Sequence, residues 1–117
     1  MKELGFEVMH VGLNCKDTAE AQQTADLLLS LFGFSETDTP ISVFSSSKIE
    51  IMKKKGAGTL GHIAIGTTDV PAAKKYLEGK GIEFDNGTAA YNEENGELKL
   101  IYLKNEIAGF AFHLLKK

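Results

Sequence analysis

The chain has 117 residues, of which 43% are hydrophobic and 25% charged, and this composition is typical of one ordinary globular domain. The net charge is -3 and all 13 basic residues are lysines, so no basic surface favours a nucleic-acid partner. No apolar run is long enough for a membrane span, and the first ten residues lack the apolar core of a signal peptide. We therefore expect a cytoplasmic protein without a membrane partner.

The first predicted elements are a strand and a helix. Residues 6–14 predict a strand, because apolar residues recur through the segment and Asn14 ends it. Asp17, with Glu20 three residues later, has the spacing of a capping box and predicts a helix over about 18–31. The apolar stripe expected to pack this helix against a sheet consists of Ala21, Ala25, Leu28 and Phe32.

The same order of elements recurs in the second half. Residues 53–61 are rich in lysine and glycine and form a junction, after which Asp69 is placed to cap a helix of about 70–79. The other predicted strands lie at 41–45, 48–52, 62–66, 82–85, 98–103 and 109–115, and the segment 35–40 is predicted as a loop or a frayed strand.

This order predicts a single α+β domain, residues 1–117. The domain consists of two tandem βαβββ units, about 6–55 and 60–117. Together they are expected to form a curved, barrel-like eight-stranded sheet with the helices on its outer face.

All three histidines fall in predicted strands. His10 and His62 begin the matching segments HVGLNCKD and HIAIGTTD of the duplication, and each shares a strand face with small residues. Alternation in their own strands brings Glu50 and His113 to the same, concave surface. Taken singly, a strand histidine is more often solvated or hydrogen-bonded than a ligand, and Glu50 fits an exposed charge equally well. The joint pattern favours a metal site with these four ligands.

The ligand set limits the metal. Three imidazoles and one carboxylate suit one divalent transition metal, namely Zn²⁺, Ni²⁺, Co²⁺, Mn²⁺ or Fe²⁺, and they argue against Ca²⁺ or Mg²⁺ alone. The single cysteine, Cys15, excludes an intramolecular disulfide and a thiolate zinc cluster.

The openings VMHVGLNCKD and LGHIAIGTTD, the helix end LLLSLFGF and the closing strand GFAFHLL resemble the vicinal oxygen chelate superfamily over nearly the whole chain. This superfamily includes glyoxalase I, methylmalonyl-CoA epimerase, bleomycin-resistance proteins and extradiol dioxygenases. The resemblance implies that His10, Glu50, His62 and His113 hold a divalent metal, which chelates vicinal oxygens of a small substrate and stabilises an enolate. It also implies that a neighbouring group moves the proton, and the candidates for this base are a metal-bound hydroxide, Glu50 and His113. We expect a homodimer, with the site closed either within one chain or across two.

One position departs from this pattern. Most catalytic members carry Glu on the last strand, where this chain has His113, so neither glyoxalase I activity nor a dioxygenase triad is expected. A narrower resemblance, in GHIAIGTTDVPAAKKYLEGKGIEF and IYLKNEIAGFAFHLLKK, is to the corresponding segment of some Firmicutes proteins labelled 2-dehydro-3-deoxyphosphogluconate (KDPG) aldolase. The chain is too short for the (β/α)₈ barrel of the familiar enzyme of that name.

These resemblances predict a metal-dependent lyase or isomerase acting on a small α-oxo or α-hydroxy carbonyl compound, such as a 2-oxo acid. The alternative is a non-catalytic small-molecule-binding or accessory domain of the bleomycin-resistance type.

Overall fold

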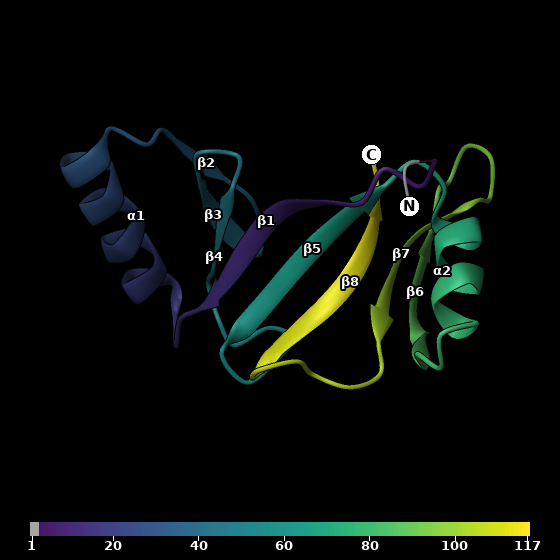
Figure 1. Cartoon of the computed structure of the whole chain (residues 1–117). Helices are drawn as coiled ribbons and strands as arrows, with labels where there is room; N and C mark the ends of the chain where they lie inside the picture. Colours follow the sequence, from purple (N-terminus) through teal and green to yellow (C-terminus); the bar gives the residue numbers. More distant parts are fainter. Residues whose placement is uncertain (1–2) are drawn as a thin grey trace.

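The computed structural model describes residues 3–117, and Figure 1 shows the arrangement of its helices and strands. Along the chain the elements are β1 (Glu7–Asn14), α1 (Thr18–Phe32), β2 (Glu36–Asp38), β3 (Ser42–Ser45), β4 (Ile49–Met52), β5 (Gly61–Thr67), α2 (Val70–Glu78), β6 (Phe84–Tyr91), β7 (Leu98–Leu103) and β8 (Phe110–Lys116). The βαβββ order occurs twice, as predicted. We call β1–β4 with α1 the first unit and β5–β8 with α2 the second unit. Within residues 3–117, neither helix combines the length and hydropathy that a membrane span requires.

The eight strands form one sheet in the order β2-β3-β4-β1-β5-β8-β7-β6. In each unit the first and last strands are parallel, and the antiparallel pair β1 and β5 joins the two units at the centre. Figure 1 shows the sheet bent into a trough, with α1 and α2 outside it at opposite ends. The predicted α+β fold, with helices on the outer face of a curved sheet, is confirmed.

The strand register determines which side chains share the concave face. Residues directly opposite each other on neighbouring strands point to the same side of a sheet. Gly12 lies opposite both Glu50 on β4 and His62 on β5. Ala64 lies opposite both His10 on β1 and His113 on β8. The sheet therefore brings the four predicted site residues to one face, around a central glycine and a central alanine.

A β-bulge in β1 sets the direction of His10. Val8 pairs with Ile65 and His10 pairs with Ala64, so Met9 is an additional residue between the two pairs. A regular ladder continued from Val8 would turn His10 to the outer face, because alternate residues of a strand point to opposite sides. The bulge is thus what brings His10 to the concave face.

Both helices begin at the predicted aspartates. Asp17 Oδ1 accepts a hydrogen bond from the N–H of Glu20 at 2.8 Å, and Asp69 makes the equivalent contact in α2 at 3.0 Å. The side chain of Glu20 accepts from the N–H of Lys16 rather than from that of Asp17, so the reciprocal bond of the box is shifted by one residue. Gly33 ends α1 in the left-handed conformation, at φ 74°.

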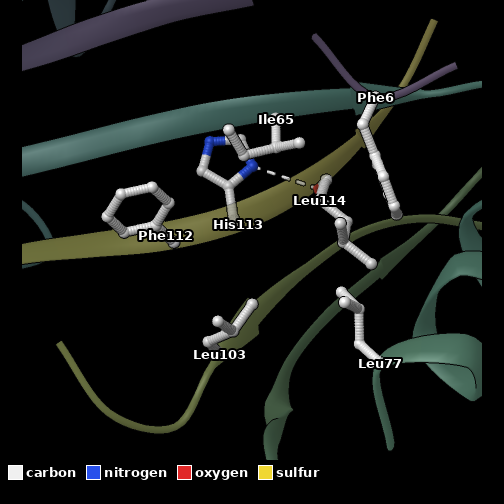
Figure 2. A pocket seen from close by; sticks show the side chains of 7 residues that line it. All are labelled: Phe6, Ile65, Leu77, Leu103, Phe112, His113 and Leu114. Atoms are coloured by element: carbon white, nitrogen blue, oxygen red, sulfur yellow. Dashed lines mark hydrogen bonds between the residues drawn. The ribbon is translucent and has the colours of Figure 1, made fainter. Parts of the chain in front are cut away.

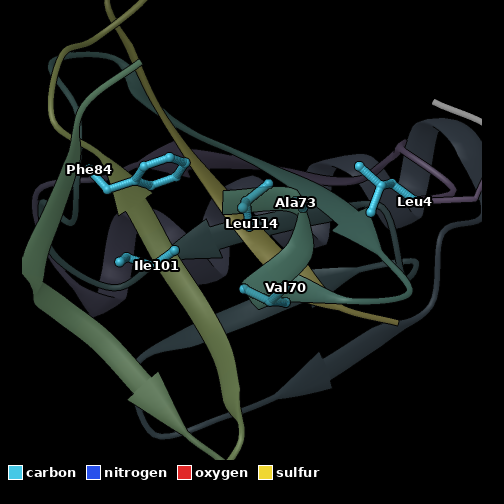
Figure 3. Close-up of a cluster of buried hydrophobic side chains, with 6 residues drawn as sticks. All are labelled: Leu4, Val70, Ala73, Phe84, Ile101 and Leu114. Atoms are coloured by element: carbon cyan, nitrogen blue, oxygen red, sulfur yellow. The ribbon is translucent and has the colours of Figure 1, made fainter. Parts of the chain in front are cut away.

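Each helix packs on its own half of the outer face. The core under α2 consists of Leu4, Val70, Ala73, Phe84, Ile101 and Leu114, as Figure 3 shows. The core under α1 consists of Cys15, Ala21, Ala25, Val43 and Ile51. The predicted helix stripe is correct at Ala21 and Ala25 but wrong at Phe32, which is 63% exposed and packs beside Phe34.

Candidate metal centre

The four predicted ligands converge at the centre of the concave face, two from each unit. The Nε2 atoms of His10 and His62 lie 3.3 Å apart. Glu50 Oε1 lies 3.0 Å from the Nε2 of His62 and 3.4 Å from that of His10. One ring nitrogen from each of the three histidines, His113 included, lies within 4.8 Å of the others. A single chain brings the three histidines together and places Glu50 beside His10 and His62.

These distances match those between neighbouring ligand atoms around a transition metal. Ligand atoms about 2.1 Å from a metal are about 3.0 Å apart in an octahedral arrangement and about 3.4 Å apart in a tetrahedral one. The three distances that join His10, Glu50 and His62 fall in this range. His10, Glu50 and His62 therefore have the spacing of neighbouring metal ligands. His113 completes a cluster of three histidines that could hold a metal ion.

Glu50 is held in its ionised form by its neighbours. Its Oε2 accepts a hydrogen bond from Ser42 Oγ at 2.8 Å, while Oε1 contacts His10 and His62. Burial alone would raise the pKa of Glu50, but the hydrogen bonds with His10, His62 and Ser42 outweigh burial and lower the pKa below its ordinary value. The carboxylate is therefore in the form that a metal requires.

His113 is buried and uncharged at neutral pH. Burial lowers the pKa of His113 to about 4, although its hydrogen bond with the Leu114 carbonyl acts in the opposite direction. The Nδ1–H donates to that carbonyl at 3.1 Å, so the lone pair is on Nε2. A backbone acceptor for the second ring nitrogen is the usual way in which a metal-binding histidine is oriented.

An apolar cavity of about 180 Å³ lies on the outer face of the sheet, between α2 and the strands. It is lined by Phe6, Ile65, Leu77, Leu103, Phe112, His113 and Leu114. Figure 2 shows the His113 ring on the other side of the β8 ribbon from Leu77 and Leu103. His113 is thus the one predicted ligand that borders this cavity, and the cavity adds no further ligand to the cluster.

Two aromatic rings that the sequence analysis missed flank the cluster at equivalent places in the two units. Phe44 lies opposite Glu50 on β4, and Tyr102 lies opposite His113 on β8. The Phe44 ring meets His10 edge-on at 5.4 Å between centroids, and the Tyr102 ring lies 4.7 Å from that of His113. Burial and the charge of Glu50 raise the pKa of Tyr102, which keeps its hydroxyl protonated. The sequence contains a signal for both rings. Each lies on the strand that forms a hairpin with the strand of a predicted ligand, directly opposite that ligand.

A second cavity, of about 240 Å³, lies beside Tyr102. Its lining includes Ala111, which pairs with His62 across β5 and β8, and polar side chains such as Asp85 and Thr88. This cavity has room for several water molecules or for a small organic molecule. Room for a small ligand therefore adjoins the cluster.

No protein-family model matches the chain, and no curated protein matches it. Solved structures do resemble it. A methylmalonyl-CoA epimerase from Streptomyces coelicolor in complex with 2-nitronate-propionyl-CoA has a TM-score of 0.68 at 17% identity, over 95% of this chain and 94% of that chain. A hypothetical protein from Bacillus halodurans C-125 has a TM-score of 0.66 at 15% identity, over 97% and 95%.

The methylmalonyl-CoA epimerase from Mycobacterium tuberculosis is a further match, with a TM-score of 0.65 at 17% identity, over 93% of this chain and 86% of that chain. Identities this low establish the fold and not the activity. The likeness extends over nearly the full length of each chain and includes both βαβββ units. The chain has the tandem fold of the vicinal oxygen chelate proteins.

Proposed function

We propose that the chain is a metal-dependent isomerase that moves a proton at the carbon beside a carbonyl group of a small α-oxo or α-hydroxy carbonyl compound. The observation that carries the proposal is the convergence of Glu50 Oε1 with the Nε2 atoms of His10 and His62, at 3.4 and 3.0 Å respectively. Structures with this fold include a methylmalonyl-CoA epimerase in complex with methylmalonyl-CoA, and epimerisation is a proton transfer of the same kind.

The proposed ligands of one divalent transition metal, which is Zn, Ni, Co, Mn or Fe, are His10, Glu50, His62 and His113. Such a metal supplies Lewis-acid stabilisation of the negative charge of an enolate. Glu50 and His113 are the candidate proton-transfer groups. Glu50 is ionised, and Nε2 of His113 carries a lone pair, so either can accept a proton when it is not bound to the metal.

A second reaction type, that of a lyase, is compatible with the same site. A lyase that cleaves or forms a carbon–carbon bond in a 2-oxo acid would use the same enolate, and the resemblance to the KDPG-aldolase-labelled segment supports this version. His113 stands where a catalytic Glu is expected for glyoxalase I, so we expect little turnover of a glutathione hemithioacetal. Replacing His113 by Glu should raise that turnover if the cavity admits glutathione.

The assembly and location of the protein remain predictions. A homodimer is supported by apolar side chains that α1 leaves exposed, Leu27, Leu31 and Phe32. A single domain made of two units is supported by the continuous sheet. The cytoplasmic location rests on the composition of the chain.

Metal content and proton exchange test the proposal. Protein purified without a histidine tag should contain close to one divalent transition metal per chain by elemental analysis. Binding should weaken in acid, because protons compete with the metal for the imidazole and carboxylate ligands. In D₂O, the metal-loaded protein should accelerate deuterium incorporation beside the carbonyl of pyruvate or methylmalonyl-CoA, measured by NMR. EDTA-treated protein and the His62→Ala variant are the controls.

The second candidate is a binding or accessory domain without chemistry. It is favoured by one observation, namely that His10, His62 and Ser42 of the same chain are hydrogen-bond partners for the Glu50 carboxylate. Tight binding of a small carbonyl compound, with no metal and no deuterium incorporation, would support this candidate and contradict the isomerase.

A further inference from the structure

We propose that Gly12 is a positioning residue that fixes the imidazole of His62 in the candidate metal centre. The inference rests on the proposed function for the metal-binding role of His62. The contact between the two residues can be tested without any metal.

The His62 ring occupies the space that a side chain at position 12 would need. A Cβ atom at Gly12 would lie 2.1 Å from Cε1, 2.2 Å from Nδ1 and 2.7 Å from Nε2 of His62. All three distances are far below van der Waals contact, and the obstacle is the ring itself. Gly12 is not among the glycines with positive φ, so its backbone conformation suits any residue. The ring of His62, and not the backbone, is what requires glycine here.

The three histidines are oriented in different ways. His113 donates from Nδ1 to the carbonyl of Leu114, which fixes its ring. The ring of His10 packs edge-on against Phe44. Nδ1 of His62 is buried and has no hydrogen-bond partner among residues 3–117. Packing against the backbone of Gly12 therefore takes the place of the hydrogen bond that usually orients a metal-binding histidine.

The duplication makes this arrangement asymmetric. Gly12 lies between Glu50 and His62 in the register, and Ala64 occupies the equivalent place between His10 and His113. Only the first of these two central positions lacks a side chain. The side chain of His62 is 5% exposed and that of His10 is 13% exposed, so His62 is the more deeply buried of the two.

A double-mutant cycle in the metal-free protein tests the contact. Gly12→Ala should lower the melting temperature by on the order of 5 °C, because the new methyl group displaces the imidazole ring of His62. In the His62→Ala background the same substitution should be neutral or stabilising, since alanine in a strand restricts the unfolded chain more than glycine does. The matched control is Gly87→Ala, an exposed glycine of β6 without positive φ, where a Cβ meets only Asp85 Oδ1, at 3.2 Å.

Metal titration tests the consequence for the site. Gly12→Ala should weaken Zn²⁺ or Co²⁺ binding by about 10–100-fold, the usual loss when the orienting partner of a metal-binding histidine is removed. Gly87→Ala should bind as the unsubstituted protein does. If Gly12→Ala does not fold, recovery of folding in the double variant supports the proposal, and failure of both variants contradicts it.

The outcomes separate this inference from the proposed function. Equal effects of Gly12→Ala in the two backgrounds would overturn the contact between Gly12 and His62. Unchanged metal affinity in Gly12→Ala would overturn the positioning role. If the unsubstituted protein binds no metal while the thermal coupling is present, the metal centre fails, the positioning role toward a metal fails with it, and the packing of His62 on Gly12 stands.

Discussion

The two units share one element order but differ in how they are packed. Under α2 the core contains large side chains, including Phe84, Ile101 and Leu114. Under α1 both fully buried helix residues are alanines, Ala21 and Ala25, and the helix leaves Leu27, Leu31 and Phe32 exposed. The duplication therefore repeats the topology without repeating the core.

The ligands follow the same division. His62 and His113, from the second unit, are buried, while His10 and Glu50, from the first unit, are partly accessible. Strand register alone is enough to place two candidate ligands per unit on the concave face. The rigidity of each pair then depends on the core behind it. We infer that the second unit is the firmer half of the site.

The largest expected effect comes from the second core. Ile101→Ala should lower the free energy of unfolding by about 2–5 kcal/mol, because Ile101 is 1% exposed and its removal leaves a cavity. Leu28→Ala, on the helix stripe of the first unit, should have a smaller effect of about 1 kcal/mol, because Leu28 is only partly buried. Urea denaturation measures both values. Equal losses would remove the distinction between the two cores.

Acid should destabilise the metal-free second unit before the first. The pKa of His113 is about 4 in the folded protein and near 6.5 when unfolded, so only the unfolded chain gains this proton between those pH values. Stability should therefore fall by about 3 kcal/mol as the pH drops from 6.5 to 4. The lowered pKa of Glu50 acts at more acidic pH, below its ordinary value of 4.5.

The variant His113→Gln isolates this effect. It should flatten the dependence of unfolding free energy on pH between 6.5 and 4, as measured by urea denaturation in the presence of EDTA. A slope that persists in this variant would mean that another group carries the acid sensitivity.

The helix caps should give intermediate effects. Asp17→Ala and Asp69→Ala each remove one cap hydrogen bond and should lower the free energy of unfolding by about 1 kcal/mol. Because α1 rests on the smaller core, Asp17→Ala should accelerate amide hydrogen exchange mainly within α1. Asp69→Ala should accelerate exchange in α2 and also in the other elements of the second unit. Identical exchange patterns for the two variants would contradict a firmer second unit.

The smallest expected effect is on the surface of α2. Lys74 Nζ lies 2.9 Å from Glu78 Oε2, four residues later. Lys74→Ala should lower the free energy of unfolding by only about 0.2–0.5 kcal/mol, as for other exposed helix pairs, and 0.5 M NaCl should reduce that difference. Thermal melts at both salt concentrations measure it. A loss above about 1 kcal/mol would mean that Lys74 also contributes through its position over the Phe84 ring, 5.6 Å from the ring centroid.

The sequence predicted the parts of the fold that depend on local chemistry. Aspartate caps and a glycine stop set the helix ends, and strand alternation placed His62 and His113 correctly. The bulge at Met9 was missed although the sequence contains its signal. Apolar residues occupy even positions at Phe6 and Val8 and odd positions from Val11 onward, so the alternation changes phase within β1.

Other features depend on tertiary structure that local patterns do not encode. β6 runs over Phe84–Tyr91, far beyond the predicted 82–85, because it pairs with β7 at both ends, through Phe84 and Asp85 and again through Ala90 and Tyr91. The irregular stretch between these pairs contains Asn86 and Gly87, whose intrinsic preferences disfavour a strand. Phe32 is the last residue of α1, where it packs beside Phe34 and stays exposed. The four site residues share a face as predicted, and their role as ligands remains a prediction.

The division of the candidate ligands, two on each side of the β1–β5 junction, bears on how the halves of the chain depend on each other. A cut between β4 and β5 would leave His10 and Glu50 on one fragment and His62 and His113 on the other. Each fragment alone would be a bidentate, weak chelator, and a metal would favour their reassembly. In the uncut chain the same ion would act as a crosslink between the halves. Separation of β1 from β5 and release of the metal would then occur together.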